Sequence, residues 1–354
     1  MVYAANDLIG KVRTISTRSQ DQRMMADKFI GKQVRVLNDS LAGVAKLNRD
    51  IRIQIGTGRD VNGLMDQRQL LVDKIAGIVP LKIYQRPHGQ ITITSSGGAV
   101  LLEGRPSVFG FTAAGIITPD MTKTSGALSG LTLNGKPIAL GGSYGLLNGG
   151  SLSAQFQIRD ETAPFASAQI DAFARNLIER FQSAGIDPTL ASGAAGLFTD
   201  GGAALKPALE TGLAGRLSLN AAVDPATGGA EWRIRDGLGA TAPGDVGNAT
   251  LISSLVDSLS ARQAASSGQF SSGASSLSGL SGDLSALNSA ARLHAEQSAV
   301  FAQSRLQELT LIEKQSGVDT DSEMQKLLLV EQAYAANARV ISTVDKMLKT
   351  ILEM

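Results

Sequence analysis

The sequence predicts an elongated α+β fold, in which helices from both ends of the chain form a long antiparallel bundle or coiled coil around an inserted, small antiparallel β domain. Three observations predict this fold. Near both ends, apolar residues recur at alternating spacings of three and four, the pattern of a helix that buries one narrow stripe. Between residues 81 and 147 the period changes to two, as in half-buried strands. The N-terminal helical pattern, about 50 residues long, exceeds the dimensions of a compact globule.

These changes of period divide the chain of 354 residues into four parts. Residues 1–80 are the N-terminal helical part of a rod domain, and residues 81–147 are the inserted β domain. Residues 148–316 are the remainder of the rod domain, and residues 317–354 are a C-terminal helix. A chain of this length can bury a large core in two or three domains.

The first helix is expected from about Asp7 to Ile55, a stretch without proline. Gly31 and Gly43 cost about 1 kcal/mol each in a helix interior, which leaves a break or kink open. Continuous, the helix would be roughly 70 Å long. The apolar stripe of its second half consists of Ile30, Val34, Leu37, Leu41, Val44, Asn48, Ile51 and Ile55.

A shorter helix follows and ends before Pro80. Its apolar face carries Arg68, which either forms a local buried ion pair with Asp66 or lies on a solvated face. The apolar positions of this helix are Val61, Leu64, Leu71, Ile75 and Ile78.

The β domain is predicted from alternation and turn chemistry. Residues 90–94 alternate, and Asn134-Gly135 between two apolar runs is a strong hairpin signal. Residues 100–102 and 108–111 supply further strands.

The rest of the rod domain mixes helices with a hairpin. Helices are expected from Glu161 to about Gly185, from 248 to 263, and from 284 to 315. Residues 217–219 and 232–234 are expected to pair as strands across a turn. The Ser/Gly-rich residues 266–282 are expected to be a flexible linker or mobile loop. On the last of these helices, small and apolar residues on one side would admit a close neighbour: Ala291, Ala295, Ala299, Ala302, Leu306 and Leu309.

The C-terminal helix is the predicted assembly surface. Gly317 can end the preceding helix, and Thr320 with Glu323 forms a capping box that starts a new one. An isolated helix is marginal in water, so this element needs the N-terminal helix or a neighbouring subunit as a partner. Asn48 and Asn337 either set the register of the bundle or lie just off the stripes. The predicted interface positions are Leu327, Val330, Tyr334, Asn337, Ile341, Val344, Leu348 and Ile351.

Composition excludes several functional classes. The net charge is +1, with 33 basic and 32 acidic residues, which gives no electrostatic footprint for nucleic acid or an anionic membrane. The chain contains no cysteine, which removes disulfides and thiol chemistry. It has no apolar run long enough to span a membrane and no secretory signal at its start.

The search for chemistry predicts no catalytic, cofactor or metal site. The two histidines, His88 and His294, are far apart in sequence and lack metal-ligand spacing, so solvated structural roles are expected. Gly141–Gly145 is glycine-rich but has no phosphate-binding lysine after it, so a turn between strand and helix is expected. Asp319 and Asp321 resemble only the start of a calcium loop.

Three stretches resemble flagellar proteins. Residues 316–343 (SGVDTDSEMQKLLLVEQAYAANARVIST) resemble the C-terminal signature shared by flagellar axial proteins. Residues 62–73 (NGLMDQRQLLVD) resemble a helix of the hook-associated junction protein family. Residues 149–174, with the segments GGSL, IRDETAP and IDAFA, resemble a second segment of that family.

The resemblance implies an exported structural protein. Such proteins leave the cell unfolded through the flagellar type III apparatus, without a cleaved signal, and reach the hook–filament junction with the help of an export chaperone. There they assemble as a ring of copies of themselves and contact hook protein and the second junction protein, and their two chain ends pair as inner helices. The axial signature expected before Met1 is absent, so the chain is expected to be shortened at its N-terminus. The short insert implies one small outer domain.

Other functions stay open at this point. The nearest alternative is another axial protein, either the second junction protein or a flagellin-like subunit. A remote alternative is a cell-wall hydrolase that uses Glu103 or Asp120 in the β domain. A third is a cytoplasmic coiled-coil scaffold.

Overall fold

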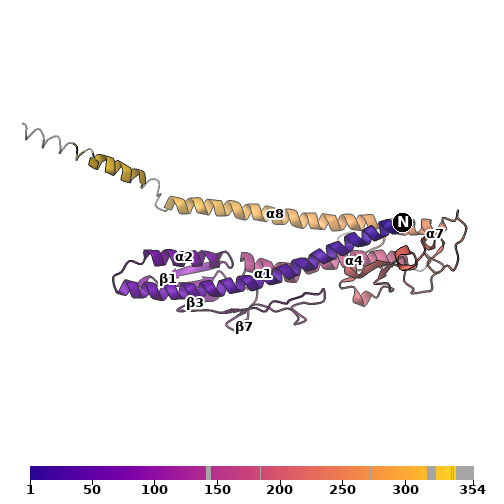
Figure 1. The fold of residues 1–354 in the computed structure, drawn as a ribbon, viewed down its shortest axis with the longest axis horizontal. Helices are drawn as coiled ribbons and strands as arrows, with labels where there is room; N and C mark the ends of the chain where they lie inside the picture. The colour runs from indigo at the N-terminus through magenta and orange to yellow at the C-terminus, as the bar shows by residue number, and fades with distance from the viewer. Residues whose placement is uncertain are drawn as a thin grey trace, which may run out of the picture. The chain divides into compact units, whose positions relative to one another are not determined.

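The structure, a computed structural model, describes residues 1–140, 145–183, 185–270, 273–316, 324–335, 337 and 339. The chain forms two compact units, Met1–Leu284 and Ser285–Met354. Figure 1 shows the first unit built along helix α1 (Val2–Gly56), which runs from the end that holds α7 (Thr250–Ser260) to the end that holds α2 (Asn62–Ala76).

Helix α1 is a single unbroken helix of 55 residues, which makes it about 80 Å long. Gly31 and Gly43 therefore do not interrupt the helix. A Cβ atom on Gly43 would lie 2.6 Å from Cδ1 of Leu71 on α2, so this glycine leaves room for the neighbouring helix. The loss of helix propensity is offset by the close packing of α1 on α2.

The insert between the helices contains two small antiparallel sheets. The first has the strand order β1-β2-β3-β4 and the second the order β5-β6-β7. Asn134 and Gly135 both have positive φ, 50° and 78°, which confirms the predicted hairpin turn between β6 and β7. The strands are β1 (Leu81–Gln85), β2 (Ile91–Ser95), β3 (Val100–Glu103), β4 (Arg105–Pro106), β5 (Phe109–Gly110), β6 (Thr132–Leu133) and β7 (Lys136–Pro137).

After the insert the chain returns to α1. A π-helical turn, η2 (Ile158–Thr162), joins α3 to α4, so the predicted helix from Glu161 starts about three turns earlier, at Gly150, as a composite element. The predicted helix 248–263 is α7, and the predicted helix 284–315 already begins at Leu277. The elements of this part are α3 (Gly150–Gln157), α4 (Ala163–Gln182), β8 (Phe198–Asp200), α5 (Leu213–Arg216), β9 (Leu217–Leu219), α6 (Arg233–Asp236) and α8 (Leu277–Ser316), with short 3-10 turns at Pro87–Gly89, Pro207–Leu209 and Pro225–Thr227.

The predicted pairing of residues 217–219 with residues 232–234 is wrong. Strand β9 pairs with β8, in the register Phe198–Leu219 and Asp200–Leu217, and Trp232 instead precedes helix α6. The turn that suggested a hairpin is capped locally, because the carboxylate of Asp224 accepts the N–H of Ala226 and starts a 3-10 turn. The sequence predicts the local turn correctly, but it does not identify β8 as the partner of β9.

The predicted Ser/Gly-rich loop of residues 266–282 ends earlier than expected, at the start of α8, and its first residues are hydrogen-bonded to the rod domain. The hydroxyl of Ser266 donates to Glu179 on α4, and the hydroxyl of Ser267 donates to Glu210. Phe270 packs against the apolar core, and the last residues of the stretch belong to α8. Composition predicted flexibility here, whereas specific carboxylate partners hold the segment.

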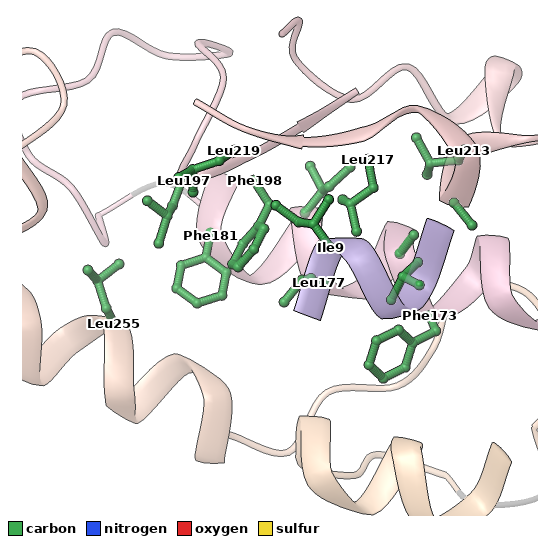
Figure 2. Close-up of a cluster of buried hydrophobic side chains, with 14 of the residues drawn as sticks. Ile9, Phe173, Leu177, Phe181, Leu197, Phe198, Leu213, Leu217, Leu219 and Leu255 are labelled. Carbon is green, nitrogen blue, oxygen red and sulfur yellow. The ribbon is translucent and has the colours of Figure 1, made fainter. Parts of the chain in front are cut away.

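Two apolar cores lie along α1. The insert core joins the C-terminal half of α1 to α2, α3 and the sheets, with Ile30, Leu37 and Leu41 fully buried as the helical stripe predicts. The terminal core joins the first turns of α1 to α4, β8, β9 and α7 (Figure 2). In the terminal core, the rings of Phe181 and Phe198 meet edge-on with their centroids 5.0 Å apart.

Candidate assembly surface

The described part of the C-terminal helix presents its apolar residues to solvent. Residues 324–335 are helical, and Leu327 and Tyr334 are 66% and 79% exposed. Val330 and Asn337, the other described interface positions, are exposed as well. The remaining predicted positions lie outside the described residues: Ile341, Val344, Leu348 and Ile351, together with Gly317, Thr320 and Glu323 of the predicted cap.

This surface is broader than the single stripe that the sequence predicts. Leu328 and Leu329 are also exposed, because residues 327–330 form a continuous apolar run that covers every side of one helical turn. This run of four apolar residues is visible in the sequence, but a heptad pattern assigns only Leu327 and Val330 of it to the interface. Burial of each such leucine is worth roughly 1.5–3 kcal/mol, so the stretch gains stability from a partner that covers it.

Helix α8 carries a second group of exposed apolar side chains beyond Ser285. Its first turns are anchored in the first unit, where Leu280 is buried in the terminal core. Large apolar residues that are widely exposed on a soluble protein mark interaction surfaces when they gather on one element. On α8 these residues are Leu293, Val300, Phe301, Leu306, Leu309, Leu311 and Ile312.

A buried polar network occupies the middle of α1. Asp27 accepts a hydrogen bond from Nη1 of Arg159 at 2.7 Å and another from the backbone N–H of Ala114 at 2.7 Å. Arg159 also binds both carboxylate oxygens of Asp160. Its guanidinium carbon lies 4.9 Å from the ring centroid of Phe156, a cation–π contact. The pair of Arg159 and Asp27 is almost completely removed from water.

The two arginines of this network have opposite electrostatic balances. Burial lowers the pKa of Arg159, but hydrogen bonds to Asp160 and Asp27 outweigh that effect and raise it overall. Burial lowers the pKa of Arg23, whose guanidinium donates to the backbone carbonyls of Arg159, Thr118 and Met121. Backbone carbonyl dipoles therefore stabilise the charge of Arg23, whereas the carboxylates of Asp27 and Asp160 stabilise that of Arg159.

Buried arginines fasten other loops in the same way. Arg68 donates to Oδ1 of Asn48 and to the carbonyl of Gly89, so the predicted local pair with Asp66 is wrong. Asn48 in turn exchanges hydrogen bonds with the backbone of Ile91, so it joins α1 to the insert instead of setting the register of a helical bundle. Arg180 donates to the carbonyls of Ser258, Ala261 and Ser275 and thereby closes the loop before α8. The sequence signal for such a buried arginine is its position on an otherwise apolar helix face.

Asp171 on α4 is a buried carboxylate with backbone partners. It accepts the N–H groups of Gly212 and Ala214 at 2.7 and 2.8 Å, at the start of α5. Burial raises the pKa of this carboxyl, although the two N–H donors act in the opposite direction. The arrangement fixes α5 against α4 in the terminal core.

Replacing Asp171 by alanine is expected to lower the free energy of unfolding by about 2–4 kcal/mol, because two buried N–H groups lose their acceptor. Urea unfolding followed by circular dichroism measures the loss. Asp7→Ala is the matched control, since its ion pair with Lys11 is exposed and contributes less than about 1 kcal/mol. Equal losses for the two variants would contradict a structural role for the Asp171 cap.

Both candidate hydrolase residues, Glu103 and Asp120, are solvent-exposed in the described structure. Glu103 forms an exposed ion pair with Arg86 at 3.3 Å. Asp120 is exposed, and a hydrogen bond with the Thr118 side chain lowers its pKa, the opposite of what a general acid needs. Both histidines are solvent-exposed, His88 in a turn and His294 on α8.

Within the described ranges, no group of three His, Asp or Glu side chains is placed to hold a metal ion. No helix of those ranges is long and apolar enough to cross a membrane. Gly141–Tyr144, in the predicted glycine-rich turn, and both Asp319 and Asp321 lie outside the described residues.

Comparison with known proteins places these features in the flagellum. Residues 1–196 match the family model of the flagellar hook-associated protein FlgK helical domain, and residues 313–354 match that of the flagellar basal body rod FlgEFG protein C-terminal. A largely helical fold with these two matches defines a structural component of the bacterial flagellum. Because the first match covers more than half of the chain, the chain belongs to the FlgK family of flagellar hook-associated proteins.

Individual relatives are more distant. Flagellar hook-associated protein 1 of Salmonella typhimurium is 27% identical over 106 residues, which is 29% of this chain and 19% of that protein. The Escherichia coli K12 protein of the same name matches to the same extent. The flagellar hook junction protein FlgK from Burkholderia pseudomallei is a structural neighbour with a TM-score of 0.43 and 22% identity, over 57% of this chain and 36% of that one. The match thus spans about a fifth of the length of the curated relatives.

Proposed function

We propose that this protein is part of the junction between the flagellar hook and filament and that it assembles with copies of itself through its C-terminal helix. The observation that carries the proposal is the exposed apolar surface of residues 324–335, which lies within the match to the axial C-terminal family. The N-terminal match favours a hook-associated protein over other axial proteins, because the C-terminal match alone fits rod proteins as well.

The partners follow from this position. A junction protein contacts hook protein on one side and a second junction protein on the other, and it reaches the cell exterior through the flagellar export apparatus with a chaperone. Its role is structural, without catalysis or a cofactor. Nothing in the described residues requires a nucleic acid or membrane partner, and the near-neutral charge of the chain agrees with that.

Immunogold electron microscopy of flagella on producing cells tests the position. Gold is expected in a narrow band between hook and filament, and purified hook protein is expected to retain the chain in a pull-down. Gold along the rod, along the filament shaft or inside the cell would contradict the proposal. Failure of hook protein to retain the chain would favour the second junction protein instead.

A further inference from the structure

The two apolar cores of the first unit are separated by a polar waist, defined as residues 13–29 of α1 and the groups that pack on them. The buried residues of this stretch are Ser16, Ser19, Arg23, Ala26 and Asp27, so no large apolar side chain holds the middle of the helix. On either side, α1 contributes Ile9 and Val12 to the terminal core and Ile30 to the insert core.

The second helical element that crosses the waist is irregular at this point. The π-helical turn η2 interrupts the path from α3 to α4, and its Arg159 points into the waist. Next to it, Ser19 donates to the carbonyl of Ala163 at 2.8 Å, and the hydroxyl of Ser167 donates to Ser19 at 2.8 Å. Contacts between α1 and α4 here are therefore hydrogen bonds of small side chains, which depend on direction more than apolar packing does.

A third segment, residues 114–129, crosses the waist without regular structure, and we name it the strap. Its backbone binds the three buried charged groups: Ala114 donates to Asp27, the carbonyls of Thr118 and Met121 accept from Arg23, and the carbonyl of Ser129 accepts from Arg159. Two apolar side chains of the strap, Ile117 and Leu128, are buried.

The strap also reaches the terminal core. Cγ of Pro119 lies 3.1 Å from the position that a Cβ atom on Gly212 would occupy, at the N-terminus of α5. Its other end leads into β6 of the insert at Thr132. One irregular segment thus runs from the insert to the terminal core, and hydrogen bonds to Arg23 and Asp27 fasten it to α1.

We propose that α1 bends at the waist, a hinge that changes the angle between the insert core and the terminal core, and that a lock formed by Arg23, Asp27 and Arg159 holds the helix at its present angle by fastening the strap. A buried polar network is bonded in full or broken at a large cost, so the lock has two states and no gradual series between them. Arg159 touches the ring of Phe156 in the insert core, whereas Arg23 and Asp27 bind backbone groups of the strap, so release through those two residues leaves the apolar packing of each core in place. The proposal rests on contacts inside Met1–Leu284 and is independent of the proposed junction function.

Distance measurements between spin labels on the full chain test the hinge. The chain has no cysteine, so Lys74→Cys on α2 and Ser253→Cys on α7, both exposed, provide one unique labelling site on each side of the waist. In the chain with its native lock, a single narrow distance distribution is expected. In Arg23→Lys, which keeps the charge but cannot reach three carbonyls at once, the distribution is expected to widen about twofold.

Asp27→Asn is the second lock variant and Arg86→Lys, at an exposed ion pair, is the matched control. Fluorescence of Trp232, the single tryptophan, reports whether the terminal core stays folded. Widening in both lock variants with unchanged fluorescence and an unchanged control supports the hinge. An unchanged width in the lock variants, a broad distribution with the native lock, or a change in Trp232 fluorescence that shows an unfolded terminal core on release would each overturn it.

Discussion

Replacing Arg159 by methionine is expected to lower the free energy of unfolding by about 3–5 kcal/mol, because removal of one partner leaves the other charge buried without compensation. Asp27 would lose its only cationic hydrogen-bond donor among the described contacts, at a site that is 1% exposed. The carbonyl of Ser129 would also lose its donor. Methionine keeps most of the side-chain volume, so the loss measures the polar network more than a cavity. Urea unfolding followed by circular dichroism gives the value.

The matched control for Arg159 is Arg86→Met. Arg86 pairs with Glu103 at the surface, where both side chains are more than half exposed, and such pairs contribute about 0–1 kcal/mol. A loss below about 1 kcal/mol for Arg159→Met would mean that the network contributes little to the fold. The difference in the free energy of unfolding between Arg159→Met and Arg86→Met is the more specific measure, since both variants remove one arginine.

Replacing Leu327 and Tyr334 together by aspartate is expected to abolish incorporation of the protein at the hook tip. The change places two charges in a surface that assembly buries, and each unpaired buried charge costs several kcal/mol. Both side chains are exposed in the isolated chain, so its unfolding midpoint is expected to stay within a few degrees of the original. Immunogold labelling of hook tips and thermal unfolding of the purified variant measure the two effects.

The control for this double variant is Leu70→Asp with Ile116→Asp, which changes two equally exposed apolar residues elsewhere on the first unit. It is expected to incorporate normally. The same loss as in the C-terminal variant is expected from Ile341→Asp with Leu348→Asp, further along the predicted stripe. Normal junctions in both C-terminal variants would show that the apolar stripe is not required for assembly.

The long-range periodic features of this fold were predictable from the sequence. Helix α1 follows from the spacing of Ile30, Leu37 and Leu41, which all turn inward, and the β6–β7 hairpin follows from the backbone that Asn134-Gly135 prefers. In both cases the signal is local, because a repeat along one element sets the buried face without knowledge of its partner. The family resemblance of residues 62–73 and 149–174 was confirmed as well, because both stretches lie within the match to the FlgK helical-domain family.

Features that depend on distant partners were not predictable. Strand β9 pairs with β8 across an intervening segment that includes α5, and nothing in residues 217–219 identifies that partner over 232–234. Arg23, Arg68 and Arg180 bind backbone carbonyls, which carry no sequence signature. Asn48 lay on the predicted stripe, but its partner Ile91 comes from the insert. The described apolar positions of the proposed assembly surface are exposed, and the subunit proposed to cover them is not part of the structure.

Cysteine accessibility at Leu327 tests the central claim most directly, since the chain offers no competing thiol. Leu327→Cys is treated with a maleimide reagent, first as the purified monomer and then in isolated hook–filament junctions. The account predicts labelling at the rate of a free thiol in the monomer and strong protection after assembly. Protection already present in the monomer, or full reactivity in the assembled junction, would contradict the assignment of this helix to assembly.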